Sequence, residues 1–333
     1  MNILLTGGTG YIGSHTAVTL IEAGHDVVLF DNLSNSDAFV LDRLEKILNK
    51  KIIFIEGNIR DFELLSKTLK EHKIEAVMHF AGLKAVGESV QDPLRYYDNN
   101  VGGSLSLIRA MQQNKVRKIV FSSSATVYGE PQYLPYDESH PTNPINPYGR
   151  TKLFIEEILR DVATSDSEWS VAVLRYFNPV GAHDSGLIGE SPKGTPNNLM
   201  PFIVKVASGE LEKLKVFGSD YETRDGSGER DYIHVLDLAE GHLASLNFLK
   251  EHKGWFAINL GSGRSTTVLE MLNAFEKVTH KNIPYEVVAR REGDLPVYYA
   301  KPDLANKTLH WKTKRTLEYM CESAWKFKEK STL

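Results

Sequence analysis

The sequence predicts an α/β protein with a doubly wound parallel sheet and a smaller C-terminal lobe. Through the first half of the chain, short apolar segments rich in β-branched residues alternate with longer helical patterns. These short segments are apolar throughout, as in strands that are covered on both faces. Alternating strands and helices of this kind are typical of a doubly wound sheet with right-handed crossovers.

Each expected element follows from this alternation. We expect strands at 2–6, 26–30, 52–56, 76–80, 118–123 and 170–175, and helices near 11–23, 37–48, 62–71, 93–113 and 147–164. After about residue 177 the chain becomes rich in Gly, Pro, Asn and Asp, and helical patterns resume at 199–208, 234–250, 267–279 and 315–328. We therefore expect a first domain at 1–176 and a smaller lobe at 177–333, with some segments of the lobe rejoining the first domain.

Composition excludes several classes of protein. The 333 residues include 39 Lys plus Arg against 43 Asp plus Glu, a net charge of −4, which disfavours a general nucleic-acid or anionic-membrane surface. Cys321 is the one cysteine, so neither an intramolecular disulfide nor a Cys-rich zinc site can form. The N-terminus lacks the pattern of a secretory signal, and no apolar run approaches the roughly 20 residues that span a bilayer. We expect a soluble, cytoplasmic protein.

A glycine-rich turn follows the first expected strand. Glycines at 7, 10 and 13 lie between the strand ending at Thr6 and a helical pattern that includes Tyr11 and Ile12. Glycines at this spacing permit a tight turn and a close approach of the backbone to a pyrophosphate. The free amides at the helix N-terminus then attract the phosphate charge. The sequence therefore predicts a Rossmann-type dinucleotide site.

An acidic residue ends the second expected strand. Asp31 follows Gly13 by 18 residues, where a carboxylate can accept hydrogen bonds from the adenosine ribose. A carboxylate there repels a 2′-phosphate, and the next residue is Asn32 rather than Arg, so NAD is favoured over NADP. The alternative is that Asp31 only caps the following segment.

A tyrosine and a lysine share one face of the helix expected at 147–164. Tyr148 and Lys152 are four residues apart, and Pro147 suits the first helical turn. Free tyrosine has a pKa of about 10, and a nearby ammonium together with a cationic nicotinamide would lower it. Tyr148 could then accept a proton from an alcohol, with a hydrogen bond from Ser124. Alone, such a pair usually lies on the protein surface without a catalytic role, but the upstream glycine turn favours a catalytic interpretation.

Longer runs of residues carry a resemblance to known proteins. The glycine turn and the Tyr148/Lys152 pair resemble the extended short-chain dehydrogenase/reductase superfamily. Five further runs make the chain similar to the UDP-glucose 4-epimerase family: FAGLKAVGES at 80–89, RYFNPVGA at 175–182, PNNLMP at 196–201, RDYIHV at 230–235 and RREGDLP at 290–296. The resemblance extends from residue 1 to about residue 320.

The resemblance implies an isomerase with an NAD-binding first domain and a substrate-binding second lobe. The implied reaction, part of galactose metabolism, reversibly inverts C4 of UDP-glucose and UDP-galactose in a homodimer. Hydride moves transiently to bound NAD through a 4-keto intermediate, with Tyr148 as base, Ser124 as its hydroxyl partner and Lys152 on the nicotinamide ribose. The implied NAD contacts are Gly7, Gly10, Tyr11, Ile12, Gly13, Asp31, Asn32, Asn58, Ile59, Phe80, Ala81, Gly82, Lys84, Asn99, Ser122, Tyr148, Lys152 and Tyr176. The implied substrate contacts are Lys84, Ser124, Ala125, Thr126, Tyr148, Asn178, Asn198, Leu199, Lys215, Phe217, Arg230, Arg291, Asp294 and Tyr298.

The second lobe must hold a diphosphate and a planar base. Guanidinium groups suit phosphate because their planar donors bind two oxygens together, and the resemblance places Arg230 and Arg291 there. It places Phe217 against uracil and Asp294 on the uridine ribose. From the residues alone, Arg230 could instead pair with Asp231, and Phe217 could be a core residue.

Two positions bear on affinity and specificity. Asn58 stands where the family typically has Asp beside adenine; its side-chain oxygen can still accept a hydrogen bond, so we expect a modest loss of affinity. Tyr298 stands at the position that the resemblance implies controls the size of the C2 substituent. We expect its bulk to disfavour N-acetylated sugars.

Other interpretations have less support. A nucleotide-sugar dehydratase commonly has an Asp-Glu pair directly after the Ser124 position or one residue later, whereas this chain has Ala125 and Thr126. A non-catalytic NAD-sensing regulator would need neither Tyr148 nor Lys152. The segment 220–226 lacks the glycine and ligands of a calcium loop, and no His-Glu-x-x-His pattern indicates zinc, so we expect no metal. His79 is expected to be a hydrogen-bonded interior histidine.

Overall fold

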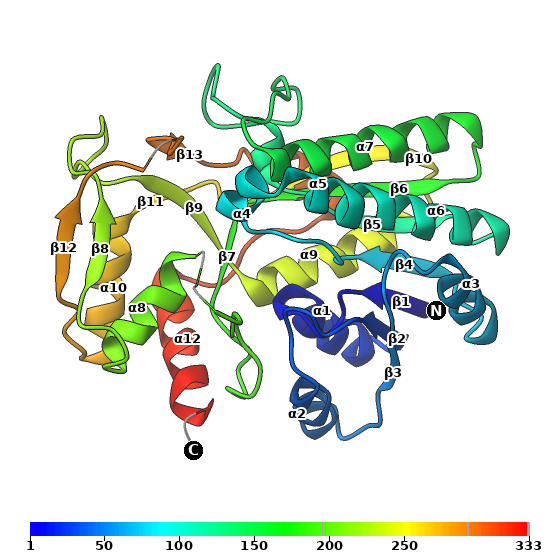
Figure 1. Cartoon of the computed structure of the whole chain (residues 1–333), viewed down its shortest axis with the longest axis horizontal. Helices are drawn as coiled ribbons and strands as arrows, with labels where there is room; N and C mark the ends of the chain where they lie inside the picture. Colours follow the sequence, from blue (N-terminus) through cyan, green and yellow to red (C-terminus); the bar gives the residue numbers. More distant parts are fainter. Residues whose placement is uncertain (195, 197, 292, 332–333) are drawn as a thin grey trace.

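A seven-stranded parallel sheet organises the first half of the chain (Figure 1). The structure is a computed structural model that describes residues 1–194, 196, 198–291 and 293–331. The sheet has the order β10-β6-β5-β4-β1-β2-β3. Its strands are β1 (Asn2–Thr6), β2 (Asp26–Asp31), β3 (Ile53–Glu56), β4 (Ala76–His79), β5 (Lys118–Ser122), β6 (Ser170–Tyr176) and β10 (Gly254–Leu260). The predicted doubly wound fold is confirmed.

Helices cover both faces of this sheet. One face packs against α1 (Tyr11–Glu22), α2 (Phe39–Leu48) and α9 (Val235–Phe248), and the other against α3 (Phe62–Glu71), α6 (Gly103–Gln113) and α7 (Pro147–Ser165). In β1, Ile3 and Leu5 enter the first core and Leu4 enters the second, and all three are fully buried. Burial on both faces explains why the strands are continuously apolar.

Two elements that follow residue 177 belong to the seven-stranded sheet and its helices. β10 pairs with β6 over seven residues, and α9 packs beside α1. Rejoining segments were expected from the sequence, although β10 was not itself predicted as a strand. A division of the chain at residue 176 into two functional domains remains a proposal.

The helix expected at 93–113 is divided into three parts. α5 (Pro93–Tyr96) leads into a π-helical turn at Tyr97–Gly102, and α6 follows. A short helix, α4 (Val86–Gln91), precedes them. π-Helical turns occur often at functional sites, and in this one Asn99 lines the large cavity while Asn100 bonds to Thr151 of α7.

The second lobe, on the left in Figure 1, has its own core and two small sheets. One sheet contains β7 (Asn178–Val180), β9 (Glu229–His234), β11 (Ser265–Thr267) and β13 (Val297–Tyr298); the other pairs β8 (Leu214–Phe217) with β12 (Tyr285–Val288). Its helices are α8 (Leu199–Ala207), α10 (Val268–Thr279) and α12 (Leu317–Ser331), and α11 (Asp303–Leu309) packs against α9 and β10. Cys321 is buried in the core of this lobe.

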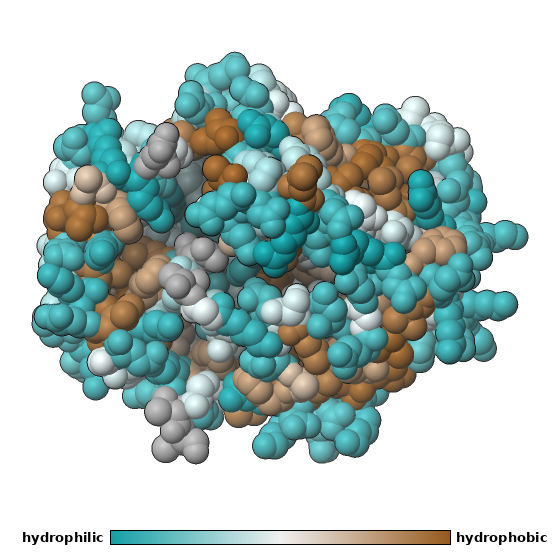
Figure 2. All heavy atoms as spheres, viewed as in Figure 1, coloured by the Kyte–Doolittle hydropathy of each residue, from teal (hydrophilic) through white to brown (hydrophobic). Residues whose placement is uncertain are grey.

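On the face shown in Figure 2, hydrophilic residues predominate and hydrophobic ones form smaller separate patches. Among the described residues, no helix has the length and apolar character needed to cross a bilayer.

Candidate active site

One large cavity brings the predicted site residues of both halves together. Its volume is about 1420 Å³. Every residue implied to contact NAD or substrate lines it, except Asn58. Two of the motifs contain residues, Asn197 and Glu292, that lie outside the described part of the chain. The cavity thus unites two sets of residues that are far apart in the sequence.

The glycine turn packs closely against neighbouring backbone at Gly7 and Gly13. Gly7 has φ +70°, and a Cβ atom there would lie 2.7 Å from the Ala81 nitrogen. A Cβ atom at Gly13 would lie 2.3 Å from the Gly7 oxygen. Gly10 caps α1 without a side-chain hydrogen bond, so the first amides of the helix keep their donors for another acceptor.

Asp31 faces this turn from the end of β2. Its Oδ2 accepts a hydrogen bond from the Thr9 nitrogen at 3.1 Å, and its Oδ1 accepts one from the Leu33 nitrogen at 3.0 Å. The Leu33 bond is the local cap that the sequence left open as an alternative. Capping does not exclude ribose binding, because each carboxylate oxygen has a second lone pair and the residue lines the cavity.

Asn58 does not line the cavity, although its neighbours Gly57 and Ile59 do. Its Oδ1 accepts hydrogen bonds from the Arg60 backbone nitrogen at 3.0 Å and from Arg60 Nε at 3.3 Å. The oxygen expected to accept from adenine is therefore engaged locally. A contact between Asn58 and adenine stays a prediction.

The Tyr148/Lys152 pair lies at the start of α7. Asn146 caps this helix by accepting from the Gly149 nitrogen at 2.8 Å, and Pro147 occupies the first turn. Lys152 is 5% exposed; its Nζ donates to the Ser122 carbonyl at 2.7 Å and lies 5.8 Å from the centroid of the Tyr148 ring. Local capping thus fixes where the helix begins and which side chains face β5.

Burial controls the protonation of both groups. It raises the pKa of Tyr148 to about 12, and a hydrogen bond with the Ser124 hydroxyl only partly opposes this. It lowers the pKa of Lys152 to about 8, against the attraction of the Glu156 carboxylate. In the free protein, burial therefore outweighs the expected lowering of the Tyr148 pKa by the Lys152 ammonium, which bonds to the Ser122 carbonyl. Ionisation of the phenol at neutral pH requires a further positive charge.

Ser124 begins a short 3₁₀ helix at Ala125–Val127. Its Oγ accepts hydrogen bonds from the Thr126 nitrogen at 3.2 Å and from Thr126 Oγ1 at 3.0 Å. These two donors leave the Ser124 proton free to point at Tyr148. Ala125 and Thr126 line the cavity beside it.

Asn100 is a positioning residue that sequence reasoning missed. Its Nδ2 donates to the Leu83 oxygen at 3.0 Å and to Thr151 Oγ1 at 3.1 Å, and its Oδ1 accepts from the Leu83 nitrogen at 2.8 Å. It therefore joins the 80–89 segment to α7. A polar residue in a helical pattern gave no distinctive signal. His79, by contrast, is confirmed as an interior histidine, bonded to Thr6 Oγ1 and Ser104 Oγ.

The arginines of the second lobe share one carboxylate. Arg230 donates to Asp294 Oδ1 at 3.1 Å, and Arg291 Nε donates to Asp294 Oδ2 at 3.0 Å. The guanidinium carbon of Arg291 lies 4.7 Å from the centroid of the Phe217 ring. The alternative pairing of Arg230 with Asp231 is wrong, because the buried Asp231 accepts instead from backbone amides and a serine of other segments.

Glu190 is a second residue without a sequence signal. Its carboxylate accepts from Asn198 Nδ2 at 2.6 Å and lies 3.5 Å from Lys84 Nζ. Both partners are predicted site residues, and they come from different halves of the chain. Tyr298 is similarly anchored, since its hydroxyl donates to Asn178 Oδ1 at 2.8 Å.

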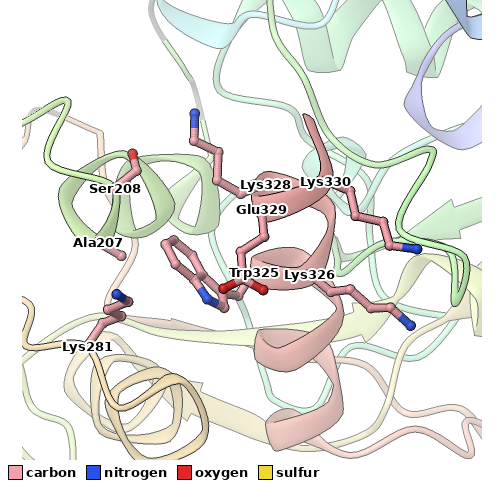
Figure 3. Close-up of a pocket in the computed structure, with 8 residues that line it drawn as sticks. All are labelled: Ala207, Ser208, Lys281, Trp325, Lys326, Lys328, Glu329 and Lys330. Carbon is pink, nitrogen blue, oxygen red and sulfur yellow. The ribbon is translucent and has the colours of Figure 1, made fainter. Parts of the chain in front are cut away.

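A separate depression of about 640 Å³ lies between α8 and α12 (Figure 3). Trp325 lies at its centre; Lys326 and Lys330 extend to one side, where they donate to the carbonyls of Asp184 and Ser185, and Lys328 points in another direction. The charges do not converge on one point, so this depression is not arranged as an anion site. In the described part of the chain, no group of three or more His, Cys, Asp or Glu side chains is placed to hold a metal.

Comparison with known proteins agrees with this geometry. Residues 3–261 match the NAD dependent epimerase/dehydratase family. The UDP-glucose 4-epimerase of Bacillus subtilis (strain 168) is 55% identical over 327 residues, which are 98% of this chain and 96% of that protein.

Solved structures are equally similar. The UDP-glucose 4-epimerase of Stenotrophomonas maltophila, with bound NAD and formylated UDP-arabinopyranose, has a TM-score of 0.98 and 48% identity, covering 100% of this chain and 99% of that chain. The enzyme of Bifidobacterium longum, in complex with NAD⁺ and UDP, has a TM-score of 0.96, 48% identity and the same coverage. This chain therefore belongs to the NAD dependent epimerase/dehydratase family and, within it, to the UDP-glucose 4-epimerases.

Proposed function

We propose that this chain interconverts UDP-glucose and UDP-galactose by reversible inversion at C4, with NAD as its resident cofactor. The observation that carries the proposal is the single cavity lined by the glycine turn, the Tyr148/Lys152 pair and the Arg230/Arg291 pair. A dinucleotide, a proton acceptor and a diphosphate anchor are the three parts that this reaction needs. Their convergence separates the site from a simple nucleotide-binding fold.

The residues present fit NAD. Any Cβ atom at Gly7 or Gly13 would strike neighbouring backbone, so these positions are kept bare beside the first amides of α1. The Asp31 carboxylate suits ribose hydroxyls and would repel a 2′-phosphate. When bound, NAD supplies the acceptor and donor of the C4 hydride and a positively charged ring.

The chain's own groups supply the proton transfer. Tyr148 would take the proton of the sugar 4-hydroxyl through its phenolic oxygen and return it after inversion. Lys152 would keep a positive charge beside the phenolate, and Ser124 would donate a hydrogen bond to it. Because burial favours the neutral phenol, the pair is poised to ionise only when the cavity gains positive charge.

Inversion also requires the sugar to present its opposite face to the same hydride acceptor. Arg230 and Arg291 would hold the diphosphate, and Phe217 would contact uracil, while the sugar itself would have to be held loosely enough to turn. In the free protein Asp294 occupies both arginines. We expect the diphosphate to take over these donors and leave Asp294 for the uridine ribose.

The dehydratase alternative is disfavoured at one position. Elimination of water needs an acid and a base beside the sugar, whereas Ala125 and Thr126, which follow Ser124 on the cavity wall, carry no titratable group. The deciding experiment incubates the purified protein with UDP-galactose and measures UDP-glucose and free NADH. Formation of UDP-glucose without net NADH supports epimerisation; a 4-keto-6-deoxy product or no turnover would contradict it.

We also propose a homodimer. Large apolar side chains are exposed where α4, α5 and α7 contact one another: Val90 is 62% exposed, Leu94 80% and Phe154 47%. A face of this kind suits a second copy of the chain. Leu94→Glu should reduce the mass measured by light scattering from dimer to monomer. Val287→Glu, at an exposed valine on β12 in the second lobe, is the matched control and should remain dimeric.

A further inference from the structure

A buried ion pair lies directly behind the segment 122–128, which contains Ser124 and is called the catalytic segment below. Glu156 on α7 is fully buried and Arg175 on β6 is 5% exposed. Their closest atoms, Glu156 Oε2 and Arg175 Nη2, are 2.6 Å apart, and Arg175 Nε donates to both carboxylate oxygens at 3.1 Å. Neither residue lines the cavity, and the proposed reaction assigns no role to either.

The pair holds the chain on both sides of Ser124. On one side, the Ser123 hydroxyl donates to Glu156. On the other, Arg175 Nη1 donates to the Tyr128 hydroxyl at 3.2 Å, directly after the 3₁₀ helix that Ser124 begins. The Tyr128 hydroxyl in turn donates to Asn259 Oδ1 at 2.6 Å, so Tyr128 is also tied to β10. Movement of the pair would therefore move Ser124.

The same pair acts on Lys152. Glu156 follows Lys152 by four residues, so both side chains lie on one face of α7. The Lys152 ammonium donates to the carbonyl of Ser122, the residue before the one that Glu156 holds. One carboxylate therefore attracts the ammonium and fixes the segment to which that ammonium is bonded.

We propose that Glu156 and Arg175 are positioning residues that hold Ser124 and the Lys152 ammonium in register with Tyr148 for proton transfer. A role in stability alone is a poor explanation, because the attraction between two buried charges only offsets the cost of removing them from water. The inference rests on the proposed epimerase function for its catalytic meaning. The arrangement itself can be tested without activity.

The charge on Lys152 depends on groups from three elements. His79 on β4 is buried and neutral, because burial lowers its pKa to about 3. The hydroxyls of Tyr148 and Tyr176 have pKa values raised by burial. The titratable and charged groups around Lys152 are Tyr148 and Glu156 on α7, Arg175 and Tyr176 on β6, and His79 on β4. Glu156 and Arg175, which form the buried ion pair, carry the opposite charges.

Because Glu156 and Arg175 carry opposite charges, removing each one should shift the titration midpoint of Lys152 in opposite directions. A purely structural role predicts no such opposition. In holoenzyme labelled with ¹³Cε-lysine, the Lys152 resonance is identified by its loss in Lys152→Met, and its titration midpoint is measured. Glu156→Gln keeps an acceptor for Ser123 but removes the negative charge, so the midpoint should fall by about one pH unit. Arg175→Met leaves the negative charge uncompensated, so the midpoint should rise by a similar amount. Shifts in the same direction, or no shift in either variant, would overturn the proposal.

Ser123→Ala tests positioning separately, and also if either charge variant fails to fold. It leaves the ion pair intact and removes only the hydroxyl that links it to the catalytic segment. We expect kcat to fall about tenfold while KM for UDP-glucose, NAD content and Tm stay unchanged. An unchanged kcat would refute the positioning role.

The matched control is Glu157→Gln, the same substitution at the next residue of α7. Glu157 forms an exposed ion pair with Arg160, so this variant should change neither the Lys152 midpoint nor kcat. If the wild-type protein shows no epimerisation but the Lys152 midpoints move as expected, the proposed function fails while the arrangement stands. If epimerisation is present and the midpoints do not move apart, only the further inference fails.

Discussion

The two ends of the cavity are built in different ways. At the proton-transfer end, Lys152 is 5% exposed and bonded to a main-chain carbonyl of a central strand. At the anchoring end, the side chain of Arg230 is 13% exposed and that of Arg291 55% exposed, and both bond to one carboxylate on a loop. On the proposed function, the first end is preorganised, and we expect the second to exchange a partner when substrate binds. Geometry is fixed where a proton moves and adjustable where the ligand enters.

The largest expected effect lies at the fixed end. Tyr148→Phe removes the proton acceptor without changing the shape of the pocket, so kcat should fall by about three orders of magnitude or more. Affinity for UDP, measured by calorimetry, should change by less than about twofold, because the anchoring end is untouched. Tyr133→Phe, at an exposed tyrosine outside the cavity, is the control. Normal turnover in Tyr148→Phe would remove Tyr148 as the base.

At the adjustable end, binding should suffer more than turnover. Arg230→Met removes a charged donor set for the diphosphate, and KM for UDP-glucose should rise about 10- to 100-fold with a smaller change in kcat. Arg290→Met is a matched control, because Arg290 pairs with Asp220 and does not line the cavity. A fall in kcat alone at Arg230 would mean that the two ends are not separable.

The pH dependence of the wild-type protein tests the fixed end again. Burial lowers the pKa of Lys152 to about 8, so its positive charge is present below that pH and is lost as pH rises through it. We expect kcat to fall above about pH 8, by about tenfold per pH unit once Lys152 is neutral. A kcat that stays constant to pH 10 would show that the Lys152 charge is not required.

The smallest effect should be on selectivity for the sugar, at Tyr298, which lies between the two ends of the cavity. The Tyr298 hydroxyl donates to Asn178, and the guanidinium carbon of Arg230 lies 4.6 Å from the centroid of the Tyr298 ring. Tyr298 therefore connects the proposed sugar pocket with the arginines proposed to hold the diphosphate. Tyr298→Ser should raise the rate on UDP-GalNAc relative to UDP-galactose several-fold by making room beside C2. Comparable rates on both substrates in the wild-type protein would contradict this expectation. The two substrates are compared side by side in a coupled assay.

The same contrast explains what the sequence could predict. The glycine turn and the Tyr148/Lys152 pair are local patterns whose meaning depends on a strand before or a helix around them, and these elements were predictable from hydrophobic periodicity. Arg230 and Phe217 were ambiguous until a resemblance was considered, because an arginine or a phenylalanine alone has no distinctive spacing.

Long-range contacts account for what was missed. The π-helical turn depends on Asn100 reaching Leu83 and Thr151, and the placement of Glu190 depends on Lys84 and Asn198. The short strands of the second lobe have two to six residues and lack a continuous apolar run. No local pattern encodes these pairings.

The pairing of β10 with β6 has a consequence for synthesis of the protein. All seven residues of β6 are buried, and β10, which covers one of its edges, ends at Leu260. A ribosome-bound chain that has emerged only through β6 therefore presents a long, apolar, unpaired strand edge. The nucleotide-binding sheet is completed only when Gly254–Leu260 has been made, so this edge of β6 lacks its neighbouring strand until then.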